Sequence, residues 1–216
     1  HRFRHNQTLW NKRKLMSIIK LNNRSVKDIT AFGSISSLGS LTHIATQTAS
    51  SSSSVSFTSG IDSTYKEYIF YFVNIHPATD DVEFKFNFST DGGSNYNVTK
   101  TTTNFRSYNY EDNSGAGLDY RTPADLAQGT GSQILTEGLG NANDECVVGV
   151  LRLFNPYSTN FVKHFICVTE ASGRTEYNFN AYIAGYANTT SSVNAVQFSM
   201  SSGNIDSGQI LLFGLN

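Results

Sequence analysis

The clearest pattern along the chain is a strict alternation of apolar and polar residues in segment 82–89. Every second residue from Val82 to Phe88 is apolar, and the residues between them are Glu, Lys and Asn. A period of two is typical of a β-strand with one face buried and the other in water. The segment therefore predicts a half-buried strand.

The preceding segment, 67–75, is apolar at both alternating sets of positions. One set is Ile69, Tyr71, Val73 and Ile75, and the other is Tyr68, Phe70 and Phe72. We expect such a strand to be covered on both faces, either inside a two-sheet sandwich or against a partner chain. The two segments predict an opening hairpin whose pairing is interrupted at Pro77, because proline has no N–H to donate. Asp91-Gly92-Gly93 supplies turn residues at the far end.

Further strands follow at the spacing of an all-β domain. We expect them at 96–110, 132–137, 145–155, 161–170, 177–186, 196–200 and 208–215, with 145–155 and 161–170 forming a hairpin. Residues 111–143 predict mostly loop, and long loops in compact domains are usually functional or form interfaces. The predicted fold is an antiparallel two-sheet sandwich of jelly-roll type with eight or nine strands.

The N-terminal 54 residues show no strand pattern and divide into two segments by composition. Residues 1–15 hold five basic residues and no acidic one, and Met16 resembles a natural start. We interpret 1–15 as an upstream or non-native segment; the alternative is a basic arm that grips nucleic acid or a neighbouring subunit. Residues 16–54 are rich in Ser, Thr and Gly, which predicts an extended arm or linker. The sandwich domain is then expected at 55–216.

Composition narrows the classes of partner. The 216 residues are 12% aromatic and 15% charged, with a formal net charge of −1. Without the five basic residues of 1–15, the chain holds 11 basic and 17 acidic residues, which argues against nucleic acid as the main partner. No apolar run approaches 18 residues, so we expect no membrane span.

No motif in the chain indicates catalysis or a cofactor. Cys146 and Cys167 are interpreted as small buried thiols, although a disulfide between them stays open. The five histidines are too scattered to predict a metal site, and GxSxG is missing. A glycan-degrading enzyme would need two facing carboxylates, whereas neighbouring acids such as Asp80 and Asp81 would point apart on a strand, and we interpret this pair as solvated turn charges. We therefore expect a protein that is not an enzyme.

The best binding candidates are tyrosines in the 105–143 region. Tyr108, Tyr110 and Tyr120 have the acidic neighbours Asp112 and Asp119. Aromatic rings beside carboxylates and amides suit the stacking of a sugar ring, so these five residues are the predicted glycan site. The alternative is that the tyrosines pack the loop onto the sheet.

Four short motifs carry a family resemblance. They are Ile61–Tyr68, Asn74–Asp80, Ser89–Tyr96 and the ending Ser207–Leu215. Together they resemble β-sandwich virion proteins of tailed bacteriophages over about 55–216. The resemblance implies a structural component of the tail, fibre or capsid surface, located in the virion. It also implies a homo-oligomer, for instance a trimer, in contact with other virion proteins and with a host-surface glycan. It supplies no catalytic residues.

Overall fold

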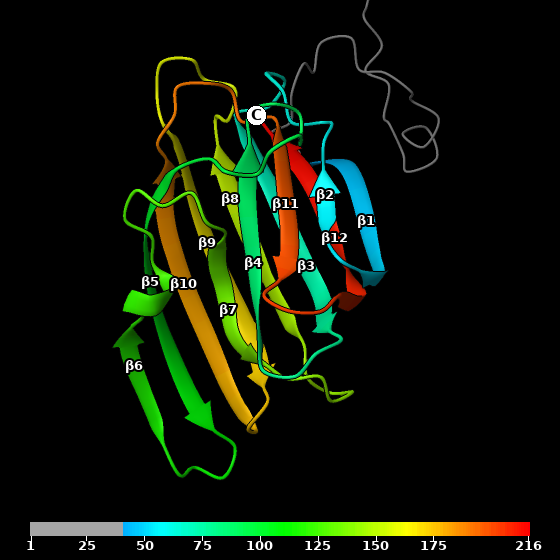
Figure 1. The fold of residues 1–216 in the computed structure, drawn as a ribbon, viewed down its shortest axis with the longest axis vertical. Coiled ribbons are helices and arrows are strands. Elements are labelled where there is room, and N and C mark those ends of the chain that lie inside the picture. Colours follow the sequence, from blue (N-terminus) through cyan, green and yellow to red (C-terminus); the bar gives the residue numbers. More distant parts are fainter. Residues whose placement is uncertain (1–40) are drawn as a thin grey trace, which may run out of the picture. The chain divides into compact units, whose positions relative to one another are not determined.

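The computed structural model describes residues 41–216 of the chain as an antiparallel all-β structure with twelve strands (Figure 1). The strands are β1 (Thr42–Ser52), β2 (Val55–Phe57), β3 (Glu67–Pro77), β4 (Val82–Ser89), β5 (Lys100–Tyr110), β6 (Ala116–Tyr120), β7 (Gln133–Leu139), β8 (Val147–Phe154), β9 (Lys163–Gly173), β10 (Tyr177–Ala187), β11 (Ala195–Met200) and β12 (Ile205–Leu215). One turn of 3-10 helix, η1 (Thr122–Ala124), precedes β7. Within 41–216 no helix has the length and apolarity to cross a membrane.

The all-β antiparallel prediction is confirmed, but the predicted eight or nine strands are too few. The pattern did not reveal β1, β2 and β6, because β2 and β6 have three and five residues. β1 lies within the predicted arm 16–54 and is mostly Ser, Thr and Ala. β structure thus begins at Thr42, ahead of the expected boundary at Val55. The predicted segment 1–15 and residues 16–40 of the predicted arm lie outside the described residues.

Two runs of paired strands make up the fold. One run has the order β1-β12-β3-β8-β9-β10-β5-β6, and the other has the order β7-β4-β11-β2. The pairing of Leu139 of β7 with Gly173 of β9 joins the two runs, so that all twelve strands belong to one hydrogen-bonded sheet. The predicted hairpin of 145–155 and 161–170 is confirmed by β8 and β9, which pair in antiparallel register.

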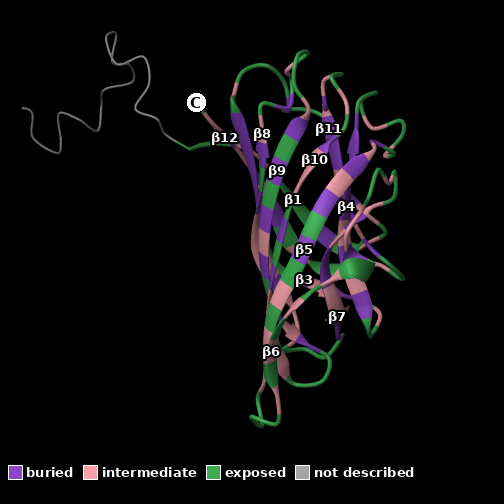
Figure 2. Cartoon of the chain, turned by 90° about the vertical axis from the view of Figure 1, so that its left-hand side faces the viewer, coloured by how far each residue is buried: buried purple, intermediate pink, exposed green. Residues whose placement is uncertain are grey.

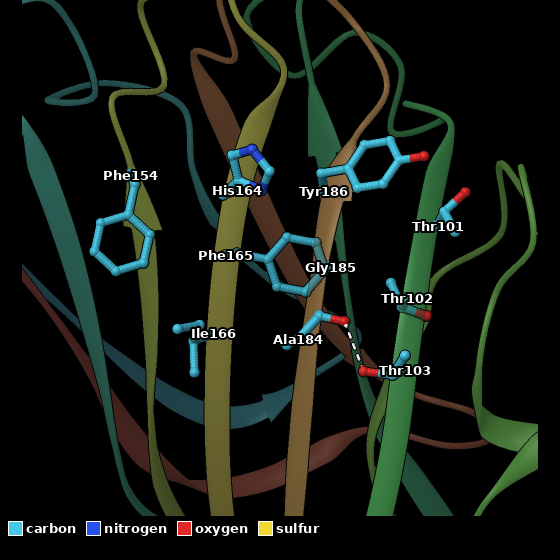
Figure 3. A pocket seen from close by; sticks show the side chains of 10 residues that line it. All are labelled: Thr101, Thr102, Thr103, Phe154, His164, Phe165, Ile166, Ala184, Gly185 and Tyr186. Carbon is cyan, nitrogen blue, oxygen red and sulfur yellow. Dashed lines mark hydrogen bonds between the residues drawn. The ribbon is translucent and has the colours of Figure 1, made fainter.

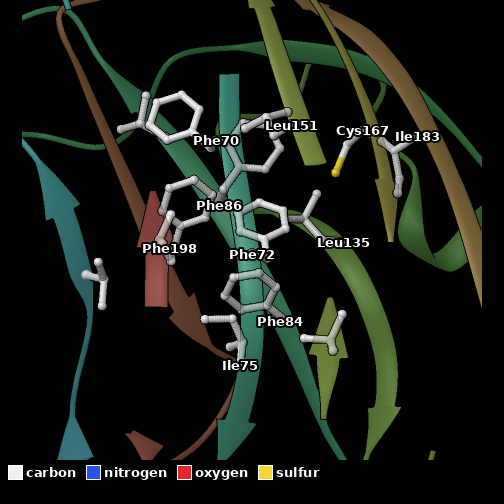
Figure 4. Packing of buried hydrophobic residues seen from close by; sticks show 14 of the residues in the cluster. Phe70, Phe72, Ile75, Phe84, Phe86, Leu135, Leu151, Cys167, Ile183 and Phe198 are labelled. Atoms are coloured by element: carbon white, nitrogen blue, oxygen red, sulfur yellow. The ribbon is translucent and has the colours of Figure 1, made fainter. Parts of the chain in front are cut away.

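The core lies between these two runs of strands (Figure 4). Phe198 of β11 is fully buried, and its ring centroid lies 5.5 Å from that of Phe70 and 5.2 Å from that of Phe72, both on β3. On the side of the second run, it stacks against Phe84 of β4 at 5.9 Å. Edge and stacked contacts of this kind stabilise a core beyond the area that they bury. Phenylalanines from the two runs therefore form one continuous aromatic core.

The expected hairpin of β3 and β4 is wrong. β3 pairs with β12 and β8, whereas β4 pairs with β11 and β7. The two strands face each other across the core, with the rings of Phe72 and Phe84 5.2 Å apart (Figures 1 and 4). The turn after Pro77 carries the chain from one run of strands to the other. The alternating pattern identified both strands correctly but held no information about their partners.

An irregularity in β3 changes which face one of its residues occupies. The register of β3 against β8 shifts between Phe72 and Ile75, and Asn74 has a positive φ of 50°. An extra residue in a strand reverses the side-chain alternation beyond it. Ile75 is consequently buried, whereas Tyr71 and Val73 remain 38% and 40% exposed. The second apolar face predicted for this strand is therefore only partly covered within the chain.

Candidate functional site

Two surfaces of the described structure are candidates for function. The first is the outer face, defined as the side of the eight-strand run that points away from the core. Successive pairings align one residue from each of seven neighbouring strands on this face. In strand order the row consists of Leu211, Tyr71, Val150, Val168, Tyr182, Phe105 and Tyr120. We call it the apolar row.

Every member of the apolar row is at least partly exposed. Tyr71, Phe105, Tyr120 and Tyr182 are exposed by 38%, 42%, 53% and 43%, and the three aliphatic members are intermediate. Exposed bands alternate with buried ones along β5 and β9 in Figure 2. The Tyr182 and Phe105 rings stack with centroids 5.1 Å apart and planes 9° apart. A continuous apolar stripe crosses the sheet where a solvated face would ordinarily carry polar residues.

A hollow of about 410 Å³ lies beside the apolar row on the same face (Figure 3). Phe154, His164, Ile166 and Tyr186 stand around it, and Ala184 leaves its floor open. Its lining is mainly apolar, and the side chains of Thr101 and Thr103 bound it on the β5 side. The hollow makes the outer face uneven, and a side chain from another surface could insert into it.

The second surface is a cleft on the inward side of β5 and β10, next to β7. It has a volume of about 350 Å³ and is lined by Asp81, Arg106, Tyr108, Tyr110, Gly138, Arg174, Thr175 and Tyr177. We call it the tyrosine–arginine cleft. Its residues come from the β3–β4 turn, β5, β7, the β9–β10 turn and β10, so only the folded chain brings them together.

The three tyrosines of the cleft are held in a chain of ring contacts. The ring centroid of Tyr110 lies 6.0 Å from that of Tyr108 and 5.4 Å from that of Tyr177. Tyr108 lies over Gly117, where an added Cβ would come 2.9 Å from its Oη. Tyr177 stacks on Phe179 with centroids 5.3 Å apart. Backbone and neighbouring rings thus fix the orientation of each tyrosine.

Ion pairs surround these rings. Arg106 Nε lies 3.2 Å from Asp119 Oδ1, and its guanidinium lies over the Tyr108 ring at 5.6 Å. Arg174 Nε lies 2.9 Å from Asp81 Oδ1. Burial raises the pKa of the Tyr177 hydroxyl above its usual value. The cleft therefore holds fixed donors and acceptors at the rim of an aromatic surface.

A third arginine, Arg121, links the strands beside the cleft. Arg121 donates from Nε and Nη2 to the two carboxylate oxygens of Glu137 at 2.8 and 2.9 Å, and from Nη1 to Asp119 at 3.2 Å. These hydrogen bonds raise the pKa of Arg121 further above its ordinary value. Because Asp119 and Glu137 are both paired with arginines, they act here as links between β5, β6 and β7.

The structure brings together only part of the predicted glycan site. Tyr108 and Tyr110 line the cleft, and Asp119 lies beside it as the partner of Arg106. Asp112 lies in the β5–β6 turn, where it accepts a hydrogen bond from Ser114 N at 2.8 Å, and that interaction lowers its pKa. Tyr120 lies on the outer face and donates to Asp125 Oδ2 at 2.6 Å. Asp112 and Tyr120 therefore lie away from the cleft.

Six of the eight residues that line the cleft were not predicted from sequence, and four of these, Asp81, Arg106, Arg174 and Tyr177, carry its charged and aromatic groups. Arg106 lies two and four residues before Tyr108 and Tyr110, so the alternation of side chains along a strand could have placed all three on one face. Asp81 was interpreted as a solvated turn charge, and it does lie in a turn. Arg174 and Tyr177 join the site only through the pairing of β9 with β10. No local pattern distinguishes them from ordinary turn and strand residues.

A third pocket combines Cys146, His76 and Asp206, a set of residue types found in nucleophilic enzymes. It has a volume of about 290 Å³. His76 Nδ1 lies 3.7 Å from Asp206 Oδ2, and its Nε2 hydrogen-bonds to the Ala142 carbonyl oxygen at 3.0 Å. Burial raises the pKa of the Cys146 thiol, whereas a nucleophilic cysteine needs a lowered pKa. A raised thiol pKa leaves less of the nucleophilic thiolate at neutral pH.

Both cysteines are free thiols. Cys167 is buried in the core, as interpreted from sequence, and burial raises its pKa strongly. Cys146 is half-buried immediately before β8. Among residues 41–216 no group of three His, Cys, Asp or Glu side chains is placed to hold a metal ion.

Comparisons of the chain with models of protein families, with curated proteins and with solved structures gave no match.

Proposed function

We propose that this chain is a structural protein, not an enzyme, that assembles with further copies of itself through its outer face. The observation that carries the proposal is the apolar row, which crosses seven strands and stays exposed in the single chain. Exposed apolar patches larger than a few hundred Å² mark interaction surfaces in soluble proteins.

The size of the outer face supports the proposal. An aromatic side chain presents about 200 Å², so the four exposed aromatics of the row leave roughly 350 Å² in water. Val73, Leu118 and Ile166 are exposed by 40%, 73% and 48% on the same face. With these and the half-buried aliphatic members of the row, the apolar area approaches the ~800 Å² per partner of a standard interface.

The two charged side chains beside the apolar row, Glu170 and Arg152, already have partners within the chain, and Glu170 accepts a hydrogen bond from Asn178 Nδ2. Arg152, which flanks the apolar row, forms an ion pair with Glu67 on the neighbouring strand. A charge that is already paired within its own chain costs less to cover than a lone one. The outer face could therefore be buried without leaving this arginine unpaired.

The strand order supports the jelly-roll sandwich within which this assembly is proposed. Along the chain, β1, β3, β8 and β12 belong to one run of strands, and β2, β4, β7 and β11 to the other. The first run begins β1-β12-β3-β8, and the second has the order β2-β11-β4-β7. Each strand of the first order is matched by its neighbour along the chain in the second order: β1 by β2, β12 by β11, β3 by β4 and β8 by β7. This is the order expected when a long hairpin of paired strands folds over on itself to form a jelly roll. In this interpretation β9, β10, β5 and β6 extend one sheet and give it its wide outer face.

The setting that we propose is a bacteriophage virion, in the tail, fibre or capsid surface. This part of the proposal rests on the resemblance of the segments 61–68, 74–80, 89–96 and 207–215 to β-sandwich virion proteins. Virion proteins act by repeated, symmetric contacts between identical subunits. A sheet with one large apolar face suits such contacts.

A charge placed in the apolar row tests the proposal. Tyr182→Glu puts a carboxylate at the centre of the row, and Tyr157→Glu is the matched control, because Tyr157 is a loop tyrosine with a similar exposure of 40%. Light scattering of the full chain should show that Tyr182→Glu dissociates the oligomer and that Tyr157→Glu does not. Equal masses for both variants and the unaltered chain would contradict assembly through this face.

A further inference from the structure

We infer that the tyrosine–arginine cleft binds a neutral sugar ring, as a carbohydrate-recognition site separate from the assembly surface. The cleft faces inward between β5, β10 and β7, whereas the apolar row lies on the opposite side of the same strands. Alternate residues of a strand point to opposite faces. Both surfaces can therefore be occupied at once.

The shape of the cleft fits a small ligand. Its volume of about 350 Å³ lies within the ~300–1,000 Å³ of small-molecule sites. Tyr108, Tyr110 and Tyr177 are half-buried and form a connected aromatic wall. An aromatic face offers an apolar platform to the C–H groups of a pyranose ring, while the tyrosine hydroxyls supply polar contacts at its edge.

The polar groups of the cleft match hydroxyls better than ions. Within residues 41–216, the hydroxyls of Tyr108, Tyr110 and Tyr177 take part in no hydrogen bond with the protein. Arg174 is paired through Nε with Asp81, and its guanidinium has further N–H groups to donate. Neighbouring sugar hydroxyls both donate and accept, so they can bridge such a guanidinium and a carboxylate.

The same pairing argues against an anionic ligand. Arg106 lies 3.2 Å from Asp119 and 3.9 Å from Glu137, and Arg174 is held by Asp81. Each arginine of the cleft therefore has a carboxylate beside it, and a phosphate, sulfate or sialic acid would meet those carboxylates as well. Like charges at this range disfavour binding. The chemistry of the cleft thus favours a neutral sugar ring over an anionic one.

The site is largely preorganised. Arg106, Tyr108, Tyr110 and Tyr177 lie on paired strands, and the link between Arg121 and Glu137 ties this part of β5 and β6 to β7. Side chains that are already fixed lose little conformational entropy when a ligand arrives. Binding therefore needs no rearrangement of the strands.

The test is an array that carries neutral oligosaccharides of glucose, galactose, mannose and N-acetylglucosamine beside sialylated and sulfated ones. The full chain should bind a subset of the neutral glycans. Tyr110→Ala and Arg174→Gln should each weaken that binding about tenfold or more. Tyr157→Ala is the matched control, because this tyrosine lies in the turn between β8 and β9, outside both the cleft and the apolar row, and the variant should bind as the unaltered chain does.

Two precautions keep the outcome decisive. Tyr110→Phe keeps the ring packing and should retain most of the binding, while Arg174 is 44% exposed in a turn, so that its replacement does not threaten folding. The inference is overturned if the unaltered chain binds no neutral glycan, if only acidic glycans bind, or if Tyr157→Ala weakens binding as much as Tyr110→Ala. Light scattering of the same samples reports on assembly, so failure of one proposal is distinguishable from failure of the other.

Discussion

Lys100 at the start of β5 should make the stability of the fold depend on pH in the alkaline range. Its side chain is completely buried. Nζ donates to Asn87 Oδ1 and, at 2.7 Å, to the Val98 carbonyl oxygen, but no carboxylate pairs with it within residues 41–216. Burial lowers the pKa of Lys100 from 10.5 to about 8, because the charged form is disfavoured away from water.

The direction in which pH changes the free energy of unfolding follows from how many protons Lys100 binds in the folded and unfolded states. Between pH 8 and 10.5 the unfolded chain still holds the proton that the folded chain has released, so the free energy of unfolding rises with pH. A difference of this size in pKa corresponds to about 3 kcal/mol. The gain is complete above the unfolded-state pKa and is absent below the folded-state pKa.

The assay is urea denaturation from pH 7 to 10.5 for the unaltered chain and for Lys100→Met. The difference in unfolding free energy between the two proteins should change by about 3 kcal/mol over this range, because every other titrating group is common to both. Lys85→Met is the control, because Lys85 on β4 is only half-buried. The reasoning is refuted if Lys100→Met keeps the pH dependence of the unaltered chain.

Three further substitutions test the core, the brace and one strained position. Phe198→Ala should lower the free energy of unfolding by about 3–5 kcal/mol in urea denaturation, whereas Phe161→Ala, at a side chain that is 70% exposed, should change it little; similar losses would contradict the aromatic core. Glu137→Gln should cost about 1–2 kcal/mol by removing the two-point contact with Arg121, and thermal unfolding should show a smaller loss in 1 M salt; a salt-independent loss would speak against an ionic brace. Gly208→Ala should lower the melting temperature in calorimetry, because Gly208 has φ of +116° and an added Cβ would lie 2.5 Å from a backbone oxygen of β3; an unchanged melting temperature would exclude this strain.

The fold class was readable from the sequence because one-sided burial leaves a period of two. The alternation from Val82 to Phe88 located β4, and the apolar runs located β8 and β9. Strand partners were not readable in the same way. β3 and β4 are neighbours in sequence but lie on opposite sides of the core, because the turn after Pro77 crosses between the two runs of strands. β1 escaped notice because it is mostly Ser, Thr and Ala, which give no apolar alternation, and its strand is defined by pairing with β12.

Part of the candidate site could also be predicted from the alternation of side chains along a strand. Tyr108 and Tyr110 share a strand face and do lie together in the cleft. Tyr120 was grouped with them by sequence distance, but the turn between β5 and β6 pairs it with Phe105 and sends it to the outer face. Arg174 reaches the cleft from the β9–β10 turn. Contacts of this kind depend on long-range register, which local patterns do not encode.

The central claim is that the apolar row is covered by further copies of the chain. The most direct test is the solution mass of the unaltered full chain by light scattering over a dilution series. One chain has a mass of 23.8 kDa. The account predicts a discrete oligomer at a small integer multiple of this mass, which persists until dilution separates its subunits. A single species of 23.8 kDa at every concentration would contradict it.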